Sequence, residues 1–171
     1  KNKNNILVVN MACNLFMKTS SCPFKEIETI LNNHKLKENC DAIIVDLHGE
    51  AASEKQAFAS MIDGKVTAVL GTHTHVPTAD LRVLPNGTAY QTDAGMCGDY
   101  NSVIGGEKST WIENFTSAVS RLKINSAKNN NTICGAIIKV SKETGLAEKA
   151  EQLVVGDILK NKIPNKKYFV G

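Results

Sequence analysis

The sequence has few aromatic residues and histidines, no long apolar run and little net charge. Aromatic residues make up 5% of its 171 residues, and only four histidines occur. No apolar run approaches the roughly 20 residues that a membrane-spanning helix needs, so a cytoplasmic protein without a membrane partner is expected. The net charge is only +3 and the basic residues are scattered, which argues against binding to duplex nucleic acid.

Several catalytic and structural devices are also missing. The five cysteines form no Cys-x-x-Cys pair and their number is odd, so reduced thiols are expected rather than disulfides or a zinc finger. The sequence has no glycine-rich phosphate loop and no Gly-x-Ser-x-Gly turn of serine hydrolases. These absences argue against a P-loop nucleotide-binding site and a serine-hydrolase nucleophile.

The hydrophobic pattern predicts one α/β domain with a mixed sheet, because strand-like and helix-like segments alternate before a run of hairpins. Pro-Asn-Gly joins one predicted hairpin and Lys-Glu-Thr-Gly the last two strands. A loop is predicted at 92–106, and the tail from about 161 is expected to be loosely packed. The predicted strands are 6–9, 41–47, 66–71, 80–84, 88–91, 132–140 and 146–155, and the predicted helices are 24–36, 53–62 and 111–122.

Some polar residues are expected to have no role in a site. Ser53, with Gln56 three residues later, predicts a capping box at the start of the second helix. Glu54 and Lys55 are then expected to be surface residues in its first turn. His34, at the polar end of a helix, is expected to be a solvated side chain.

The other three histidines follow two predicted central strands. His48 ends one apolar run, and His73 and His75 follow the next in Gly-Thr-His-Thr-His. Neighbouring parallel strands bring their carboxyl ends to one place, where ligands bind. In an extended segment, His-x-His directs both rings to the same side. Because neutral imidazole binds zinc, iron and manganese, the pattern predicts a metal site made of His48, His73 and His75.

Three carboxylates lie near these histidines in the sequence. Asp46 and Glu50 flank His48, where a carboxylate could orient the ring of a ligating histidine. Asp93, in Thr-Asp-Ala-Gly-Met, is a candidate for the same crevice, although Asp-x-Gly also favours a turn. The residues alone leave open whether the site holds one metal ion or two.

Three motifs together resemble the YmdB-type bacterial metallophosphoesterases, calcineurin-like enzymes described as cyclic-nucleotide phosphodiesterases. They are Asp-Leu-His-Gly-Glu-Ala-Ala-Ser-Glu-Lys at 46–55, Gly-Thr-His-Thr-His-Val at 71–76 and Thr-Asp-Ala-Gly-Met at 92–96. The resemblance implies an α/β mixed-sheet sandwich of the metallophosphoesterase type, with four α/β/β/α layers when complete. Residues 1–171 would form the C-terminal portion of that single domain.

The resemblance also implies a role for each histidine. His48 and His73 would bind one metal ion and His75 the other, the ions being iron, manganese or zinc. They would polarise a small phosphate ester, such as a cyclic nucleotide, and generate a hydroxide nucleophile. The remaining ligands, and the histidine that serves as catalytic acid or base, belong to an N-terminal half that this sequence lacks. That half would be supplied in cis or in trans, and the 171 residues alone are expected to be inactive.

Three alternatives to this phosphodiesterase or phosphatase stay open. One is a capsule-synthesis-type metallophosphoesterase-like domain. Another is an inactive half-domain that serves as an assembly or interaction module. The third is a mononuclear zinc hydrolase with three histidine ligands, which would lose all metal when His75 is changed to Ala. The natural substrate and the formation of a homo-oligomer are also left open.

Overall fold

The computed structural model describes residues 4–17, 21–117 and 122–164 of the chain. The strands are β1 (Ile6–Ala12), β2 (Ala42–His48), β3 (Ala68–Thr72), β4 (Arg82–Val83), β5 (Ala89–Gln91), β6 (Gly98–Asp99), β7 (Asn131–Val140) and β8 (Ala147–Val155). The helices are α1 (Pro23–Asn33), α2 (Ala52–Met61) and α3 (Lys108–Thr116). The predicted mixed α/β class is confirmed.

A five-stranded sheet in the order β1-β2-β3-β5-β4 carries the candidate site. β1, β2, β3 and β5 run parallel, and β4 pairs antiparallel with β5 as the predicted hairpin. The register places His48, the last residue of β2, beside Thr72, the last residue of β3. We call the end of the sheet where β1, β2, β3 and β5 finish its carboxyl end, and the opposite end its amino end.

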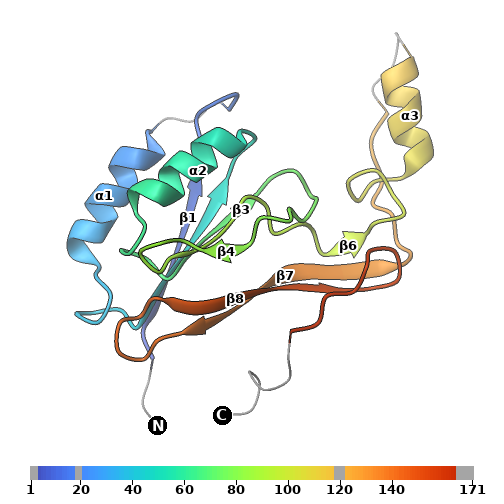
Figure 1. Cartoon of the computed structure of the whole chain (residues 1–171). Helices are drawn as coiled ribbons and strands as arrows, with labels where there is room; N and C mark the ends of the chain where they lie inside the picture. Colours follow the sequence, from blue (N-terminus) through green and yellow to red (C-terminus); the bar gives the residue numbers. More distant parts are fainter. Residues whose placement is uncertain (1–3, 18–20, 118–121, 165–171) are drawn as a thin grey trace.

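Helices and a second sheet cover the two faces of the central strands (Figure 1). α1 and α2 pack on one face, and a core cluster there includes Ile27, Val45, Leu47, Phe58 and Ile62. The antiparallel sheet β6-β7-β8 packs on the other face, where small residues allow close approach: Ala68, Ala89 and Ala147. Burial on both faces explains the continuous apolar runs of β2 and β3. The described residues thus form helix, sheet and sheet layers, and the fourth layer of the predicted sandwich is not among them.

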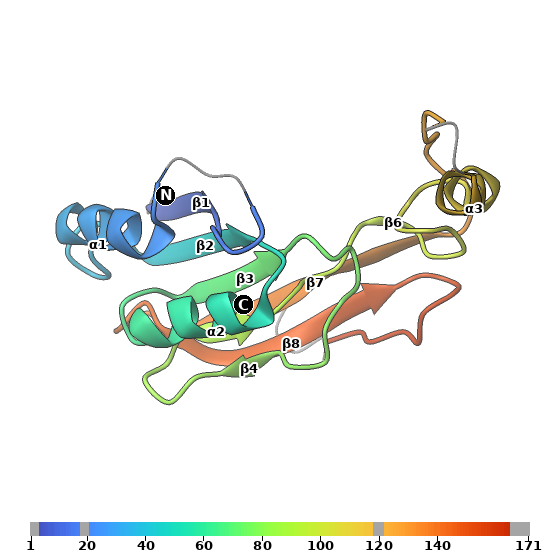
Figure 2. The same cartoon turned by 90° about the horizontal axis from the view of Figure 1, so that it is seen from above.

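β1 is an edge strand with one open face. Ile6 and Val8 are 60% and 66% exposed, whereas Val9 is buried in the core on the helix side. α3 lies well away from α1 and α2, at the far end of β7 in both views (Figures 1 and 2). Among the described residues, no helix combines the length and apolar character needed to cross a membrane.

Some element boundaries differ from the prediction. The Ser53–Gln56 capping box is wrong, because α2 begins at Ala52 after Ala51, which makes no side-chain cap, and Ser53 is already helical. α1 ends at Asn33, since the backbone of His34 is extended. The predicted loop 92–106 contains β6, which pairs with β7.

The last predicted helix and the tail fall partly on residues that are not described. α3 ends at Thr116, and Leu122 is no longer helical, while 118–121 lie outside the described residues. In the tail, Val154 and Lys162 exchange two backbone hydrogen bonds of 2.8 Å, which ties this part to β8. The prediction of a loosely packed tail otherwise concerns 165–171, which are outside the described residues.

Candidate metal centre

His48 and His73 face each other at the carboxyl end of the sheet. His48 Nε2 lies 3.1 Å from His73 Nδ1, and the two ring centroids are 4.9 Å apart with the rings inclined at 76°. Both side chains are partly buried. The topology therefore brings two of the three predicted ligands together, as expected for neighbouring parallel strands whose carboxyl ends meet.

The hydrogen bonds around His48 assign its tautomer. The Thr72 hydroxyl donates to Asp46 Oδ1 at 3.0 Å, so it accepts from His48 Nδ1 at 3.1 Å. Asn10 Nδ2 donates to the other Asp46 oxygen at 2.7 Å and fixes the carboxylate. A ring that donates through Nδ1 carries its lone pair on Nε2, the nitrogen that faces His73. Asp46 therefore orients His48 through Thr72, and not by direct contact.

Glu50 contacts His73, although it lies next to His48 in the sequence. Glu50 Oε2 is 2.9 Å from His73 Nε2, which places a hydrogen-bond donor at that nitrogen. A neutral His73 then carries its lone pair on Nδ1, directed at the lone pair of His48 Nε2. Two lone pairs at 3.1 Å repel each other unless a cation, either a proton or a metal ion, lies between them. The residues present thus fit a shared metal ion.

His75 has a different environment. β3 ends at Thr72, and His73 and His75 have positive φ values of 129° and 66°, so the side-chain alternation of an extended strand does not apply here. His75 is exposed, and its Nδ1 lies 3.0 Å from the carbonyl oxygen of Ile104. A donor at Nδ1 leaves Nε2 as the lone-pair nitrogen. Within the described ranges, no group of three or more His, Cys, Asp or Glu side chains is arranged to hold a metal ion.

Lys55 is the residue that sequence reasoning missed. It was expected at the surface but is fully buried. Its ammonium group donates to Thr72 O at 2.8 Å and Thr92 O at 3.0 Å, and lies 3.6 Å from Asp93 Oδ2. Two N–H groups of the ammonium thus have carbonyl acceptors, and the Asp93 carboxylate balances its charge. The sequence did hold a signal, because Lys55 lies three residues before Phe58, on the helix face that is buried.

Asp93 holds the turn between the two histidines of the His-x-His motif. Its side chain is almost completely buried at 1% exposure. Asp93 Oδ2 accepts from the backbone N–H of Thr74 at 2.8 Å, and Oδ1 accepts from that of Gly95 at 2.9 Å. The second bond is the turn chemistry expected of Asp-x-Gly. Asp93 therefore lies at the carboxyl end of the sheet, bound to the backbone of the histidine turn.

Glu54 is also not a free surface residue. Its carboxylate accepts from the backbone N–H groups of Asn14 at 2.8 Å and Leu15 at 2.9 Å, which anchors the loop after β1. Burial, together with the nearby Glu54 charge, raises the pKa of Cys13 to about 11. The Cys13 thiol is therefore neutral at physiological pH and poorly nucleophilic.

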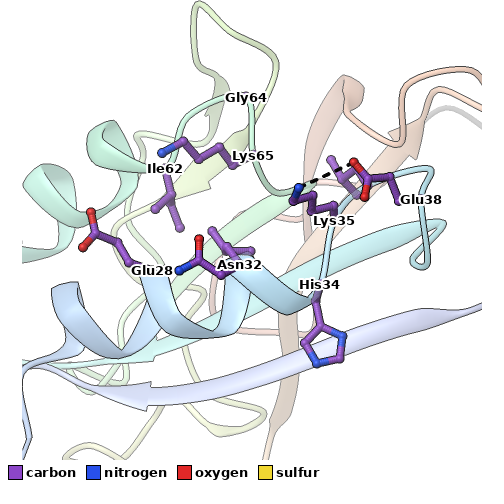
Figure 3. A pocket seen from close by; sticks show the side chains of 10 residues that line it. Glu28, Asn32, His34, Lys35, Glu38, Ile62, Gly64 and Lys65 are labelled. Atoms are coloured by element: carbon purple, nitrogen blue, oxygen red, sulfur yellow. Dashed lines mark ion pairs between the residues drawn. The ribbon is translucent and has the colours of Figure 1, made fainter.

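A pocket of about 550 Å³ lies at the amino end of the sheet, away from His48, His73 and His75 (Figure 3). It is lined by residues of the last turns of α1, such as Asn32, and by residues between α1 and β3, among them Lys35, Glu38 and Lys65. Lys35 and Glu38 point toward each other and form an ion pair of 3.7 Å on the surface. His34 is exposed here, as predicted. The pocket shares no residue with the candidate metal centre.

Comparison with known proteins places this geometry in a family. The model of the YmdB-like protein family matches residues 1–153. The chain belongs to this family. The resemblance inferred from the motifs is therefore confirmed, and the match does not favour the capsule-synthesis alternative.

Two of the similar proteins carry names of enzymes that act on phosphate esters. A 2',3'-cyclic-nucleotide 2'-phosphodiesterase of Bacillus subtilis (strain 168) is 35% identical over 156 residues, which cover 91% of this chain and 58% of the relative. A crystal structure of a novel phosphatase from Mycoplasma pneumoniae gives a TM-score of 0.76 at 34% identity, covering 95% of this chain and 58% of that one. The structure of a hypothetical protein from Thermus thermophilus gives 0.79 at 36%, covering 89% and 57%. The chain spans just over half the length of these relatives.

Proposed function

We propose that this chain supplies the three-histidine half of a two-metal site that hydrolyses phosphodiesters, with cyclic nucleotides as the substrate class. The facing ring nitrogens of His48 and His73, 3.1 Å apart, carry the proposal because their lone pairs need a shared cation. The substrate class is supported by the name of the Bacillus subtilis relative.

The proposed ligands divide between two ions. His48 Nε2 and His73 Nδ1 would hold one ion, and His75 Nε2 the other. Iron, manganese or zinc would suit these imidazoles, and when bound would provide Lewis acidity toward the phosphate oxygens and acidify water. The chain's own contribution is orientation: Thr72 sets the tautomer of His48, and Glu50 that of His73.

The proposed site needs a further segment. Three neutral imidazoles carry no negative charge, so a carboxylate from elsewhere would have to balance two divalent ions. The open face of β1, with Ile6 and Val8 exposed, and the greater length of the relatives support completion by an N-terminal segment. That segment would also supply the catalytic acid or base, either in the same polypeptide or from a partner.

Hydrolysis by the natural polypeptide that carries this sequence tests the proposal. We expect it to hydrolyse 2',3'-cyclic AMP and bis(p-nitrophenyl) phosphate, and to lose this activity when a chelator removes the metal. His48→Ala should lower the rate about 100-fold or more, because direct ligands matter more than the outer partners that contribute roughly 10–100-fold. Undiminished hydrolysis by His48→Ala, or by the chelated protein, would contradict the proposal.

A further inference from the structure

The turn that carries His73 and His75 has an unfavourable backbone. Both residues have positive φ values, which side chains with a Cβ rarely adopt. β3 ends at Thr72, so ladder hydrogen bonds of the sheet do not hold this segment. Such a conformation persists only when the surrounding structure determines it. Other groups must therefore hold the turn in place.

Hydrogen bonds from residues outside β3 hold the turn at Thr72, Thr74 and His75. Lys55 binds the carbonyl oxygen of Thr72, immediately before the turn, and the Asp93 carboxylate binds the N–H of Thr74 at its centre. The carbonyl oxygen of His75 accepts from Met96 N at 3.3 Å. The first two of these groups, Lys55 and Asp93, also pair with each other at 3.6 Å.

The same ammonium group joins the ends of β3 and β5. Lys55 binds Thr92 O as well as Thr72 O, and Gly71 makes this close approach possible. A Cβ on Gly71 would lie 1.8 Å from Thr92 O and 3.0 Å from Lys55 Cδ. The N–H of Ala94 adds a bond of 2.8 Å to Gly71 O. α2, β3 and the loop after β5 are thus locked together beside the histidine turn.

A buried charged pair is a poor means of stabilising a core. Apolar side chains of similar volume often stabilise a protein as well or better. Phe58 and Ala59, which share the buried face of α2 with Lys55, show that this face packs apolar groups. The hydrogen bonds to Thr72, Thr92 and Thr74 give the pair a purpose that an apolar replacement would not serve.

We propose that Lys55 and Asp93 are positioning residues that hold the His73–Thr74–His75 turn in its ligand-binding conformation. Neither touches the proposed ions; Lys55 acts through the carbonyl oxygen of Thr72, and Asp93 through the N–H of Thr74. The inference rests on the proposed metal site for its purpose, but the position of the turn can be measured in metal-free protein.

The test compares Lys55→Met and Asp93→Asn with the control Thr67→Val. Thr67 is buried near the amino end of β3, where its hydroxyl accepts from Ile43 N and donates to Gly145 O. Removing this hydroxyl in Thr67→Val also breaks two buried hydrogen bonds, but these lie far from the turn. The readouts are the imidazole nitrogen signals of His73 and His75 by NMR and the amide exchange rate of Thr74. His34, at the amino end, is the internal reference.

Lys55→Met should displace the signals of His73 and His75 but not that of His34. It should also speed Thr74 exchange about tenfold or more, because opening of the turn becomes local and frequent. Asp93→Asn should displace the same signals, and it decides the matter if Lys55→Met does not fold. The double variant removes both charges, so it should regain part of the melting temperature while the histidine signals stay displaced. Changes no larger than those in Thr67→Val would overturn the proposal.

Metal titration of the same variants separates this inference from the proposed function. If the wild-type polypeptide binds metal, Lys55→Met should weaken its affinity about 10–100-fold, as is usual for groups that orient ligands. If the wild type binds none, the metal site is wrong, while the NMR comparison still decides whether Lys55 and Asp93 position the turn.

Discussion

The two ends of the five-stranded sheet use polar residues in different ways. At the carboxyl end, Lys55 and Asp93 are buried and bound to the backbone of the loops around the histidines. At the amino end, Lys35 and Glu38 pair with each other, with side chains 54% and 69% exposed. The amino end has the pocket of about 550 Å³, which this exposed pair lines. Buried charged side chains that bind the backbone therefore distinguish the end with the proposed metal site, whereas the volume of a pocket does not.

The largest difference between the two ends should appear in activity. His73→Ala removes a proposed ligand and should lower phosphodiester hydrolysis about 100-fold or more. His34→Ala, the matched change at the amino end, should leave the rate within about twofold, because His34 is exposed and distant. Steady-state rates of the two variants of the natural polypeptide make the comparison. Equal hydrolysis rates in His73→Ala and His34→Ala would contradict the proposed site at the carboxyl end.

Replacing Lys55 should destabilise the fold much more than replacing Lys35. Lys55→Met leaves Asp93 buried without its partner, so it should lower the free energy of unfolding by about 3–5 kcal/mol. Lys35→Met breaks only the exposed pair with Glu38 and should change it by less than about 1 kcal/mol. Urea denaturation of both variants measures the difference. A loss under about 1 kcal/mol for Lys55→Met would show that the buried pair is not needed for the fold.

Replacing two glycines by alanine should affect the free energy of unfolding differently. Gly71→Ala forces a Cβ against Thr92 O, so overpacking should lower the free energy of unfolding by about 1–3 kcal/mol. A Cβ at Gly135, on β7, meets no atom within 4 Å. Gly135→Ala should therefore be neutral or stabilise the fold by up to about 1 kcal/mol, because alanine has less unfolded-state freedom. If Gly71→Ala proves as stable as wild type, β3 and Thr92 are not as closely packed as described.

The smallest expected effect concerns acid stability. Burial alone would raise the pKa of Asp80, but hydrogen bonds from Thr78 and Thr92 outweigh it and lower the pKa below its usual 3.8. Asp80 therefore stabilises the fold above pH 3.8, and this contribution disappears as the pH falls through the lower folded-state value. Asp80→Asn should lower the melting temperature at neutral pH, and the gap from wild type should shrink in acid. A gap that widens below pH 3.8 would contradict the assigned direction.

Asp41 offers the comparison at the amino end. The backbone N–H of Asn5 and the side chain of Lys37 lower the pKa of Asp41, which is exposed to solvent. Solvent screens such contacts, so Asp41→Asn should change the pH dependence of melting less than Asp80→Asn does.

The sequence predicted the parts of the site that depend on strand ends. His48 and His73 lie together because parallel strands bring their carboxyl ends to one side, which hydrophobic runs alone reveal. Lys55 was misplaced at the surface, because its burial depends on carbonyl oxygens from two loops that are distant in sequence. The environment of His75 could not be predicted either, because it depends on the positive φ of His75 and on a contact with the carbonyl oxygen of Ile104.

The ratio of metal ions to protein in the natural polypeptide tests the central claim most directly. Two ions of iron, manganese or zinc per chain are expected, with one lost mainly in His75→Ala and the other in His48→Ala. Complete loss of metal in His75→Ala would indicate the mononuclear zinc alternative instead. No stoichiometric metal in the wild-type polypeptide would contradict the metal centre and leave the chain as an assembly or interaction module.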